Sequence, residues 1–244
     1  MLAAASSAET PTSTPRLFAL VPCAGVGERA GTSVPKQYAH IAGRSVAGHT
    51  LLALAQVRRL HATLVVLSPG DQYFEHHCPG FVGWVARCGG NSRAASVAQG
   101  LDELIRRGAS ACDWVLVHDA ARCLLQPAWV DRLIDACLDD PVGGLLAMPL
   151  ADTLKQAEHG RVTQTVARAG KWAAQTPQMF RLGLLRDSLA RVGSGVTDEA
   201  GAIEAAGHSP LLVPGALENF KVTWPDDFKL AARLMAQPTQ DSPA

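Results

Sequence analysis

The sequence lacks an excess of charge of either sign, because 22 lysine and arginine residues face 22 aspartate and glutamate residues. Proteins that bind nucleic acids usually carry a basic excess, so we expect no nucleic-acid partner. Long apolar runs are also missing: the longest, near 17–26 and 142–151, cover about ten residues, whereas a membrane-spanning helix needs roughly 20. The composition therefore predicts a globular protein without a membrane partner.

Cysteine is sparse as well, with six residues that form no Cys-x-x-Cys pair and no regular spacing. This pattern indicates neither a disulfide framework nor a zinc site. The first residues, MLAAASSAETPTSTPR, lack the basic start and the long apolar core of a signal peptide. We therefore expect a cytoplasmic protein with a disordered leader over 1–15, a single domain over 16–236 and a disordered tail over 237–244.

Short apolar runs alternate with helical patterns along the chain. The expected strands cover 17–22, 63–67, 81–86, 114–117 and 144–150, and the expected helices between them cover 45–57, 92–107 and 127–138. This alternation predicts a Rossmann-like α/β fold of three layers, in which a mostly parallel, twisted sheet carries helices on both faces. Ligands of such sheets bind beyond the carboxyl ends of the strands. Candidate site residues should therefore follow Pro22, Ala86, Val117 and Leu150.

The alternation of strand and helix breaks between 151 and 175, where polar and apolar residues alternate around His159-Gly160. This pattern predicts a β-hairpin arm that projects from the sheet. Exposed strands of this kind commonly pair with a second subunit, which suggests a homodimer formed through the arm. Beyond the arm we expect helices over 182–191 and 198–206, a strand over 211–213 and a closing helix after Pro225.

A glycine-rich segment, PCAGVGERAGTSVPKQY, follows the first strand. Its residues Gly25 to Ala30, GVGERA, formally satisfy the GxGxxG/A fingerprint of dinucleotide-binding folds. That fingerprint opens a helix directly and needs an acidic residue about 20 positions later, but no Asp or Glu occurs between Arg29 and Gly70. The P-loop pattern GxxxxGK[ST] is missing too. Two interpretations remain: a loop whose backbone, Arg29 and Lys36 hold phosphate groups, or a surface loop with incidental charges.

The same segment, written PxAGxGxR followed by PKQY, resembles the signature of the 2-C-methyl-D-erythritol 4-phosphate cytidylyltransferases. Further motifs of that family follow in order, namely GGNSRAASV at 89–97, VHDAAR at 117–122, DTLK at 152–155, TPQ at 176–178, TDEA at 197–200 and NFKVT at 219–223. The resemblance covers about 17–235. The departures, such as Cys23 in place of the usual alanine, remove no charge on which the chemistry depends.

The resemblance implies a nucleotidyltransferase of the GT-A-like type that transfers CMP from CTP to 2-C-methyl-D-erythritol 4-phosphate and releases pyrophosphate. Arg29 and Lys36 are the implied catalytic residues. Mg²⁺, or another divalent cation, is the implied cofactor, with Asp119 as its protein ligand. The implied CTP-binding residues are Pro22, Cys23, Ala24, Gly25, Gly27, Gly89, Gly90, Ser96, Asp119 and Ala120. The implied residues for the second substrate are Arg122, Thr153, Arg168 and Lys221, of which Thr153 and Arg168 lie on the arm that family members insert into the partner's site.

Plainer interpretations stay open for several of these residues. Asp119 could simply cap the next turn, Ser96 could be an ordinary helix serine, and Arg168 could be an exposed charge on the arm. His76-His77-Cys78 favours a surface turn over a metal site, and Asp198 favours a helix N-cap. At the level of function, the alternatives are a cytidylyltransferase for another polyol phosphate, such as ribitol 5-phosphate, and a catalytically silent nucleotide-binding protein.

Overall fold

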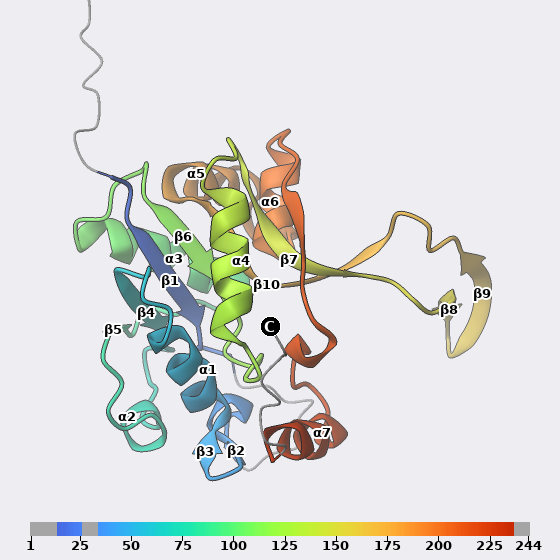
Figure 1. Ribbon diagram of the computed structural model, residues 1–244, viewed down its shortest axis with the longest axis horizontal. Coiled ribbons are helices and arrows are strands. Elements are labelled where there is room, and N and C mark those ends of the chain that lie inside the picture. The colour runs from blue at the N-terminus through green and yellow to red at the C-terminus, as the bar shows by residue number, and fades with distance from the viewer. Residues whose placement is uncertain (1–13, 26–33, 237–244) are drawn as a thin grey trace, which may run out of the picture.

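The computed structural model describes residues 14–25 and 34–236. Its centre is a seven-stranded sheet in the order β11-β7-β10-β6-β1-β4-β5 (Figure 1). The strands are β1 (Leu17–Pro22), β4 (Ala62–Val66), β5 (Trp84–Ala86), β6 (Trp114–Val117), β7 (Gly143–Pro149), β10 (Trp172–Arg181) and β11 (Leu211–Pro214). All neighbouring strands run parallel except that β10 runs antiparallel to both β6 and β7. The mostly parallel α/β sheet predicted from the sequence is confirmed.

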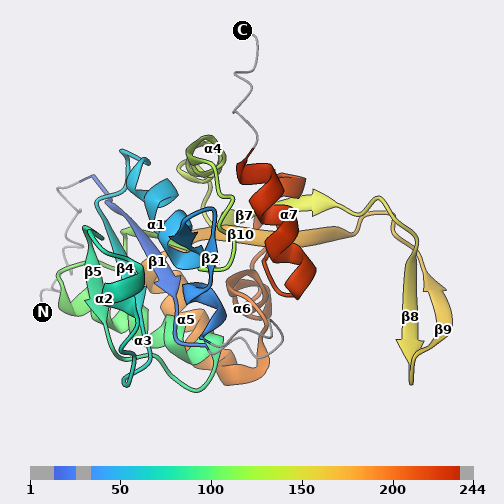
Figure 2. The same cartoon turned by 90° about the horizontal axis from the view of Figure 1, so that it is seen from below.

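Helices cover both faces of this sheet and complete three layers. One face carries α1 (Val46–Ala55) and α4 (Pro127–Cys137), and the other carries α3 (Arg93–Arg106), α5 (Leu182–Val192) and α6 (Glu199–Ala205). The sheet lies edge-on between the two helical layers in Figure 2. No helix of the described residues is long and apolar enough to cross a membrane.

The sequence specifies where these helices begin. Ser45 precedes α1 and accepts a hydrogen bond from the Gly48 backbone N–H, and Ser92 does the same for α3 through Ala95. A side-chain oxygen at this position satisfies a backbone donor that the helix itself cannot pair. Asp198 caps α6 in the same way through Gly201, as predicted. Both boundaries of α3, which supplies a residue to the pocket described below, lie within one residue of the predicted span.

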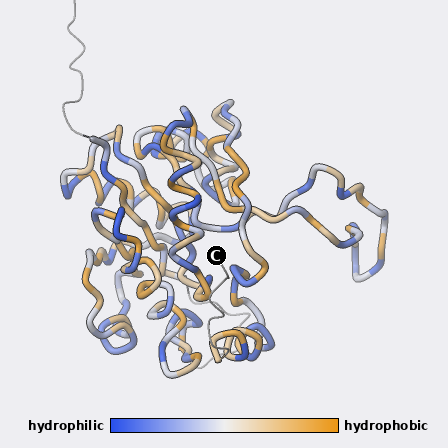
Figure 3. The backbone as a smooth tube through the Cα atoms, in the orientation of Figure 1, coloured by the Kyte–Doolittle hydropathy of each residue, from blue (hydrophilic) through white to orange (hydrophobic). Residues whose placement is uncertain are grey.

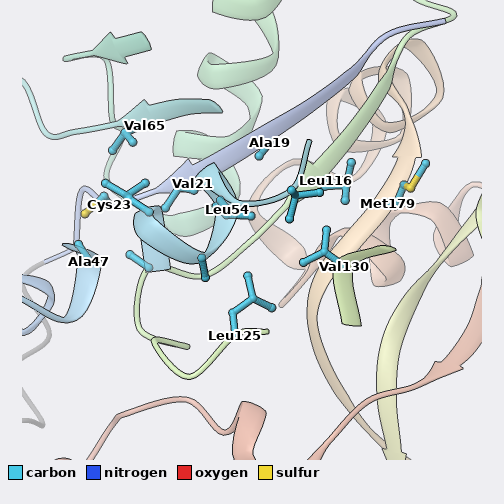
Figure 4. Close-up of a cluster of buried hydrophobic side chains, with 14 of the residues drawn as sticks. Ala19, Val21, Cys23, Ala47, Leu54, Val65, Leu116, Leu125, Val130 and Met179 are labelled. Atoms are coloured by element: carbon cyan, nitrogen blue, oxygen red, sulfur yellow. The ribbon is translucent and has the colours of Figure 1, made fainter. Parts of the chain in front are cut away.

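Two apolar cores flank the sheet because its strands are buried on both faces. In β1, Ala19 and Val21 pack toward α1 and α4, whereas Phe18 and Leu20 pack toward α3, α5 and α6. Figure 4 shows the first core, and the hydropathy colouring of Figure 3 shows apolar residues running along the central strands. Each fully buried Leu, Val or Phe side chain stabilises the fold by about 1.5–3 kcal/mol. These cores hold the carboxyl ends of β1 and β6 in fixed positions.

Short elements complete the body of the protein: η2 (Lys36–Tyr38), β2 (His40–Ile41), β3 (Arg44–Ser45), α2 (Phe74–His77), η3 (Gly193–Gly195), η4 (Leu217–Asn219) and α7 (Pro225–Met235). The strand expected over 81–86 is shorter and begins at Trp84. The Phe81 ring packs edge-on against Phe74 of α2, with 5.7 Å between the ring centroids, and so stays outside the sheet.

The predicted arm is a two-stranded hairpin of β8 (Leu154–Glu158) and β9 (Arg161–Val166). His159 and Gly160 form its turn with φ angles of 50° and 76°, a backbone region that glycine tolerates well. The hairpin projects far from the body of the protein in both ribbon views (Figures 1 and 2), and nearly all of its residues are exposed. The leader and the tail predicted from the sequence lie largely or wholly outside the described residues.

Candidate active site

A pocket of about 220 Å³ opens where β1 and β6 end. Its lining residues are Pro22, Cys23, Ala24, Gly25, Lys36, Gln37, Arg93, Ser96, Asp119, Ala120, Ala121 and Lys221. They come from the chain after β1, from η2, from the first turns of α3, from the chain after β6 and from the segment before α7. Nine of the residues predicted from the sequence therefore meet here, at the edge of the sheet where the topology places ligands.

The described start of the glycine-rich segment forms one wall of the pocket. Gln37 holds its backbone in place, because the side-chain amide donates hydrogen bonds to the carbonyl oxygens of Gly25 (2.8 Å) and Cys23 (3.2 Å). Gly27 and Arg29 lie outside the described residues. Gln37 was not among the predicted site residues, although it is part of the PKQY motif.

Gly89 and Gly90 follow β5 and lie behind this wall. A Cβ atom on Gly89 would meet the backbone oxygen of Leu67 at 2.7 Å and would also collide with Ala24, so only glycine fits there. The backbone N–H of Gly90 donates to the Ser96 hydroxyl at 3.1 Å. Ser96 thus faces both the glycine pair and the pocket, which is more than an ordinary helix serine does.

Asp119 is the centre of a charged network at the pocket wall. One carboxylate oxygen accepts from Arg93 Nε at 2.8 Å, and the other lies 2.9 Å from Lys221 Nζ. Arg122 Nε lies 3.8 Å from the second oxygen. Behind the wall, Arg93 also forms a two-pronged ion pair with Glu199, with N–O distances of 2.6 and 3.0 Å. Asp119 therefore does more than cap a turn.

The electrostatic environment keeps Asp119 ionised. Burial by itself would raise the pKa of this carboxyl, but the charges of Arg93 and Lys221 outweigh burial and hold that pKa far below its usual range. Burial raises the pKa of Glu199, and Arg93 opposes that shift. Among the described residues, four cationic side chains (Lys36, Arg93, Arg122 and Lys221) lie in or around the pocket against these two carboxylates, so the pocket favours an anionic ligand.

Buried polar groups hold this network against the sheet. The backbone N–H of Asp119 donates to the Thr176 hydroxyl at 3.0 Å, and that hydroxyl lies 3.1 Å from His118 Nδ1. Burial lowers the pKa of His118 to about 4, so its imidazole is neutral at pH 7. Arg122 donates to the carbonyl of Asn219 at 2.7 Å, which ties the chain after β6 to the segment before α7.

That segment also brings Lys36 and Lys221 to the same side of the pocket. Lys36 Nζ donates to the Val222 carbonyl at 3.0 Å, and the Val222 N–H donates to the Ala121 carbonyl at 2.9 Å. The hydrogen bond from Lys36 to Val222 thereby joins two segments of the pocket lining that are 186 positions apart in the sequence.

Thr153 and Arg168 lie apart from this pocket. Both are exposed on the arm, and neither lines the pocket of its own chain. Arg122 borders the pocket without lining it. Among the described residues, no group of three or more His, Cys, Asp or Glu side chains could hold a metal ion; His76 and His77 belong to the short helix α2.

Arg93, Ala121 and Glu199 were not predicted as site residues. Arg93 stands inside the quoted GGNSRAASV motif and Glu199 inside TDEA. A charged residue at the start of a helix that follows a glycine pair was the available signal for Arg93. The sequence held no signal that Arg93 and Glu199 meet, because 106 positions separate them.

Comparison with known proteins agrees with this architecture. The family model described as "IspD: 2-C-methyl-D-erythritol 4-phosphate cytidylyltransferase" matches residues 17–237. A protein of that name from Burkholderia cenocepacia is 51% identical over 235 residues, which are 94% of this chain and 100% of the relative. A bifunctional enzyme IspD/IspF from Albidiferax ferrireducens is 57% identical, and the match spans 94% of this chain but only 55% of that relative.

Solved structures give the same result. The crystal structure of a 4-diphosphocytidyl-2C-methyl-D-erythritol synthase superimposes with a TM-score of 0.82 at 39% identity, covering 92% of this chain and all of that one. The 2-C-methyl-D-erythritol 4-phosphate cytidylyltransferase from Thermus thermophilus gives a TM-score of 0.74 at 31% identity, covering 90% and 98%. The resemblance inferred from the ordered motifs is thus confirmed, and the chain belongs to the 2-C-methyl-D-erythritol 4-phosphate cytidylyltransferase family of nucleotidyltransferases.

Proposed function

We propose that this chain transfers CMP from CTP to 2-C-methyl-D-erythritol 4-phosphate, yielding 4-CDP-2-C-methyl-D-erythritol and pyrophosphate for isoprenoid precursor synthesis. The observation that carries the proposal is the pocket itself, which combines the glycine-rich backbone after β1 with Lys36, Asp119 and Lys221. Exposed backbone N–H groups and a cationic wall suit a nucleoside triphosphate. The family membership supports CTP and methylerythritol phosphate as the pair of substrates.

In the proposed reaction, a phosphate oxygen of the acceptor forms a bond to the α-phosphorus of CTP, and the bond between that phosphorus and the oxygen bridging to the β-phosphate breaks. Pyrophosphate leaves with the electron pair of the broken bond. The attacking oxygen is already an anion, so no general base is required. Catalysis then depends on alignment and on the neutralisation of negative charge at phosphorus. We assign that neutralisation to Lys36 and Arg29, and the acceptor phosphate to Lys221, Arg122 and the arm residues.

Asp119 fits a Mg²⁺ ion that arrives with CTP. One of its oxygens accepts from Arg93, and the other lies near Lys221 and, at 3.8 Å, Arg122. Each oxygen keeps a lone pair for a metal ion, and the depressed pKa of Asp119 ensures that the carboxylate is charged. Among the described residues that line the pocket, Asp119 is the one carboxylate. Triphosphate oxygens and water would therefore complete the coordination of the metal ion. When bound, the ion would neutralise triphosphate charge.

We further propose that two chains form a homodimer in which each arm completes the partner's site. An isolated two-stranded hairpin is marginally stable in water, and this one projects into solvent with Val162 62% exposed. Thr153 and Arg168 do not line the pocket of their own chain, and they flank the two strands of an arm that extends away from the body, which supports a role in the partner's site. Four buried cysteine thiols favour a reducing cytoplasm as the compartment.

Pyrophosphate release tests the reaction. CTP, Mg²⁺ and methylerythritol phosphate should release pyrophosphate, whereas ATP or UTP in place of CTP should not. Lys36→Ala should abolish most of the release, while Lys229→Ala, which removes an exposed lysine of α7, should leave it unchanged. Release with ribitol 5-phosphate but not with methylerythritol phosphate would identify ribitol 5-phosphate as the acceptor. Absence of release with either acceptor would support a catalytically silent nucleotide-binding protein.

Mixing two inactive variants tests the dimer. Lys36→Ala and Arg168→Ala homodimers should each be poorly active, because each lacks one component of both sites. In the mixed dimer, one site combines an intact Lys36 with an intact partner Arg168. When equal amounts exchange at random, about half of the dimers are mixed, and each mixed dimer has one intact site out of two. The mixture should therefore recover about a quarter of the original activity. Absence of recovery after subunit exchange, verified by mass spectrometry, would show that the arm does not act in the partner's site.

A further inference from the structure

Glu199 is a fully buried carboxylate directly behind the pocket wall. It is 1% exposed and begins helix α6, on the face of the sheet opposite α1 and α4. It does not line the pocket. It nevertheless contacts Arg93, which lines the pocket.

The Arg93 guanidinium joins two carboxylates with its planar set of donors. Two N–H groups point to the two oxygens of Glu199, and Nε points to one oxygen of Asp119 at 2.8 Å. Because the guanidinium group is planar and hydrogen-bonds to both carboxylates, its orientation is fixed. The position of Glu199 therefore determines the geometry of the contact between Arg93 and Asp119. The second oxygen of Asp119 is then left to Lys221 at 2.9 Å and, more distantly, to Arg122 at 3.8 Å.

Glu199 is itself held by rigid elements. The Gln178 side chain on β10 accepts a hydrogen bond from the Ala200 N–H at 2.8 Å and donates one to the Asp198 carboxylate at 2.9 Å. Asp198 in turn caps α6. The start of α6 is thus fastened to the central sheet, and a group held by packed elements keeps its geometry better than one on a loop.

Charge balance gives Glu199 a second effect. Arg93 is largely buried, and Glu199 neutralises it. Without that partner, the freed N–H groups of Arg93 would turn to Asp119 and compete with Lys221 and with any ligand for its oxygens. The carboxylate at the pocket wall would remain charged but would be engaged differently.

We propose that Glu199 is a positioning residue for the transfer reaction: through Arg93 it holds Asp119 so that one oxygen stays anchored and the other faces Lys221 and the ligands. The inference rests on the proposed function. It assigns to Glu199 no contact with either substrate.

The test is Glu199→Gln, which keeps the size of the side chain but not its charge. The amide offers one acceptor oxygen in place of two, and its NH2 group would oppose an N–H group of Arg93. We therefore expect kcat to fall about 10- to 100-fold through misalignment. The dissociation constant for CTP, measured by calorimetry without turnover, should change less than about threefold, because the cationic wall remains.

Glu103→Gln is the matched control. Glu103 is 5% exposed, lies on α3, the helix that begins with Arg93, and pairs with Arg106 and Arg107, away from the pocket. Because each substitution removes the charge of a buried carboxylate, we expect both Glu103→Gln and Glu199→Gln to lower the melting temperature, but Glu103→Gln should leave kcat within about twofold of the original. Glu199→Asp keeps the charge on a shorter chain that cannot reach both N–H groups, and it should also lower kcat, which supplies a second test if the glutamine variant does not fold.

The outcomes separate the two ideas. Unaltered kcat in Glu199→Gln or Glu199→Asp, with pyrophosphate release by the original chain, would overturn the positioning role alone. Equal losses of kcat and CTP affinity in Glu199→Gln would overturn it as well, because a general loss of structure would explain them. Absence of release by the original chain would overturn the proposed function and this inference together.

Discussion

Asp119→Asn should destabilise the protein because it removes the charge that three cations share. Asp119 is 7% exposed, with Arg93 at 2.8 Å, Lys221 at 2.9 Å and Arg122 at 3.8 Å. Removing one partner of a buried ion pair typically costs 3–5 kcal/mol, since the other charge stays buried without compensation. Lys221 is 38% exposed, so water screens its share. We therefore expect a loss of about 3 kcal/mol, or roughly 6–12 °C in melting temperature for a chain of this size.

A double-mutant cycle can attribute this loss to the network. Once Asp119 is neutral, Lys221 is a surplus cation beside Arg93, so Lys221→Met should cost less in the Asp119→Asn background than in the original chain. The coupling free energy between the two sites should be about 1 kcal/mol or more. Lys229→Met is the control, because Lys229 pairs with Asp226 on the exposed side of α7, and it should combine additively with Asp119→Asn to within about 0.5 kcal/mol.

Urea denaturation followed by circular dichroism gives the free energies of unfolding, provided that the transitions are two-state. A loss below about 1 kcal/mol for Asp119→Asn, or a coupling to Lys221 no larger than that to Lys229, would refute the reasoning. Either result would mean that solvent, rather than Asp119, compensates the cations at the pocket wall.

Three further predictions concern the arm, the glycine pair and acid stability. Arg168→Ala should raise the KM for methylerythritol phosphate about tenfold or more and the KM for CTP far less, in steady-state assays of pyrophosphate release; equal increases would reject contact with the acceptor phosphate. Gly89→Ala should weaken CTP binding roughly tenfold in calorimetry, because its Cβ would meet a backbone carbonyl at 2.7 Å, whereas Gly70→Ala, with nothing within 4 Å, should bind normally. Burial would raise the pKa of Asp113, but hydrogen bonds from a neighbouring backbone N–H and from Arg16 hold it below its usual range. Its contribution to stability should thus be complete above the unfolded-state pKa of about 4 and be lost as the pH falls below it; Asp113→Asn should flatten that acid limb in denaturation experiments, and an unchanged slope would contradict the assignment.

Local signals in the sequence were sufficient for most of the sheet and for its helices. The run LFALVP has no polar residue to turn toward water, so it predicted a strand that is buried on both faces, as β1 is. Ser45 and Ser92 can cap a helix by themselves, and both do so. The turn at His159-Gly160 was predictable because its backbone region is set by the residues that occupy it.

Strand β10 could not be predicted in this way. Its segment WAAQTPQMFR contains a proline and three uncharged polar residues, Gln175, Thr176 and Gln178, which resemble a loop pattern, and yet these three are at most 7% exposed. They are tolerated in the centre of the sheet because hydrogen bonds to distant groups satisfy them, among them the Asp119 N–H and the Asn219 side chain. Only the folded chain brings those partners within reach.

The sequence by itself thus determined the alternation of strands and helices, the glycine-rich segment and the ordered motifs that indicate the family. Each of these depends on the identity of neighbouring residues, which the chain carries whether or not it is folded. The tertiary structure alone decided that β10 enters the sheet antiparallel and that Arg93 joins Asp119 to Glu199. Such contacts depend on which distant surfaces pack together, and the free energy of that packing is a property of the whole chain.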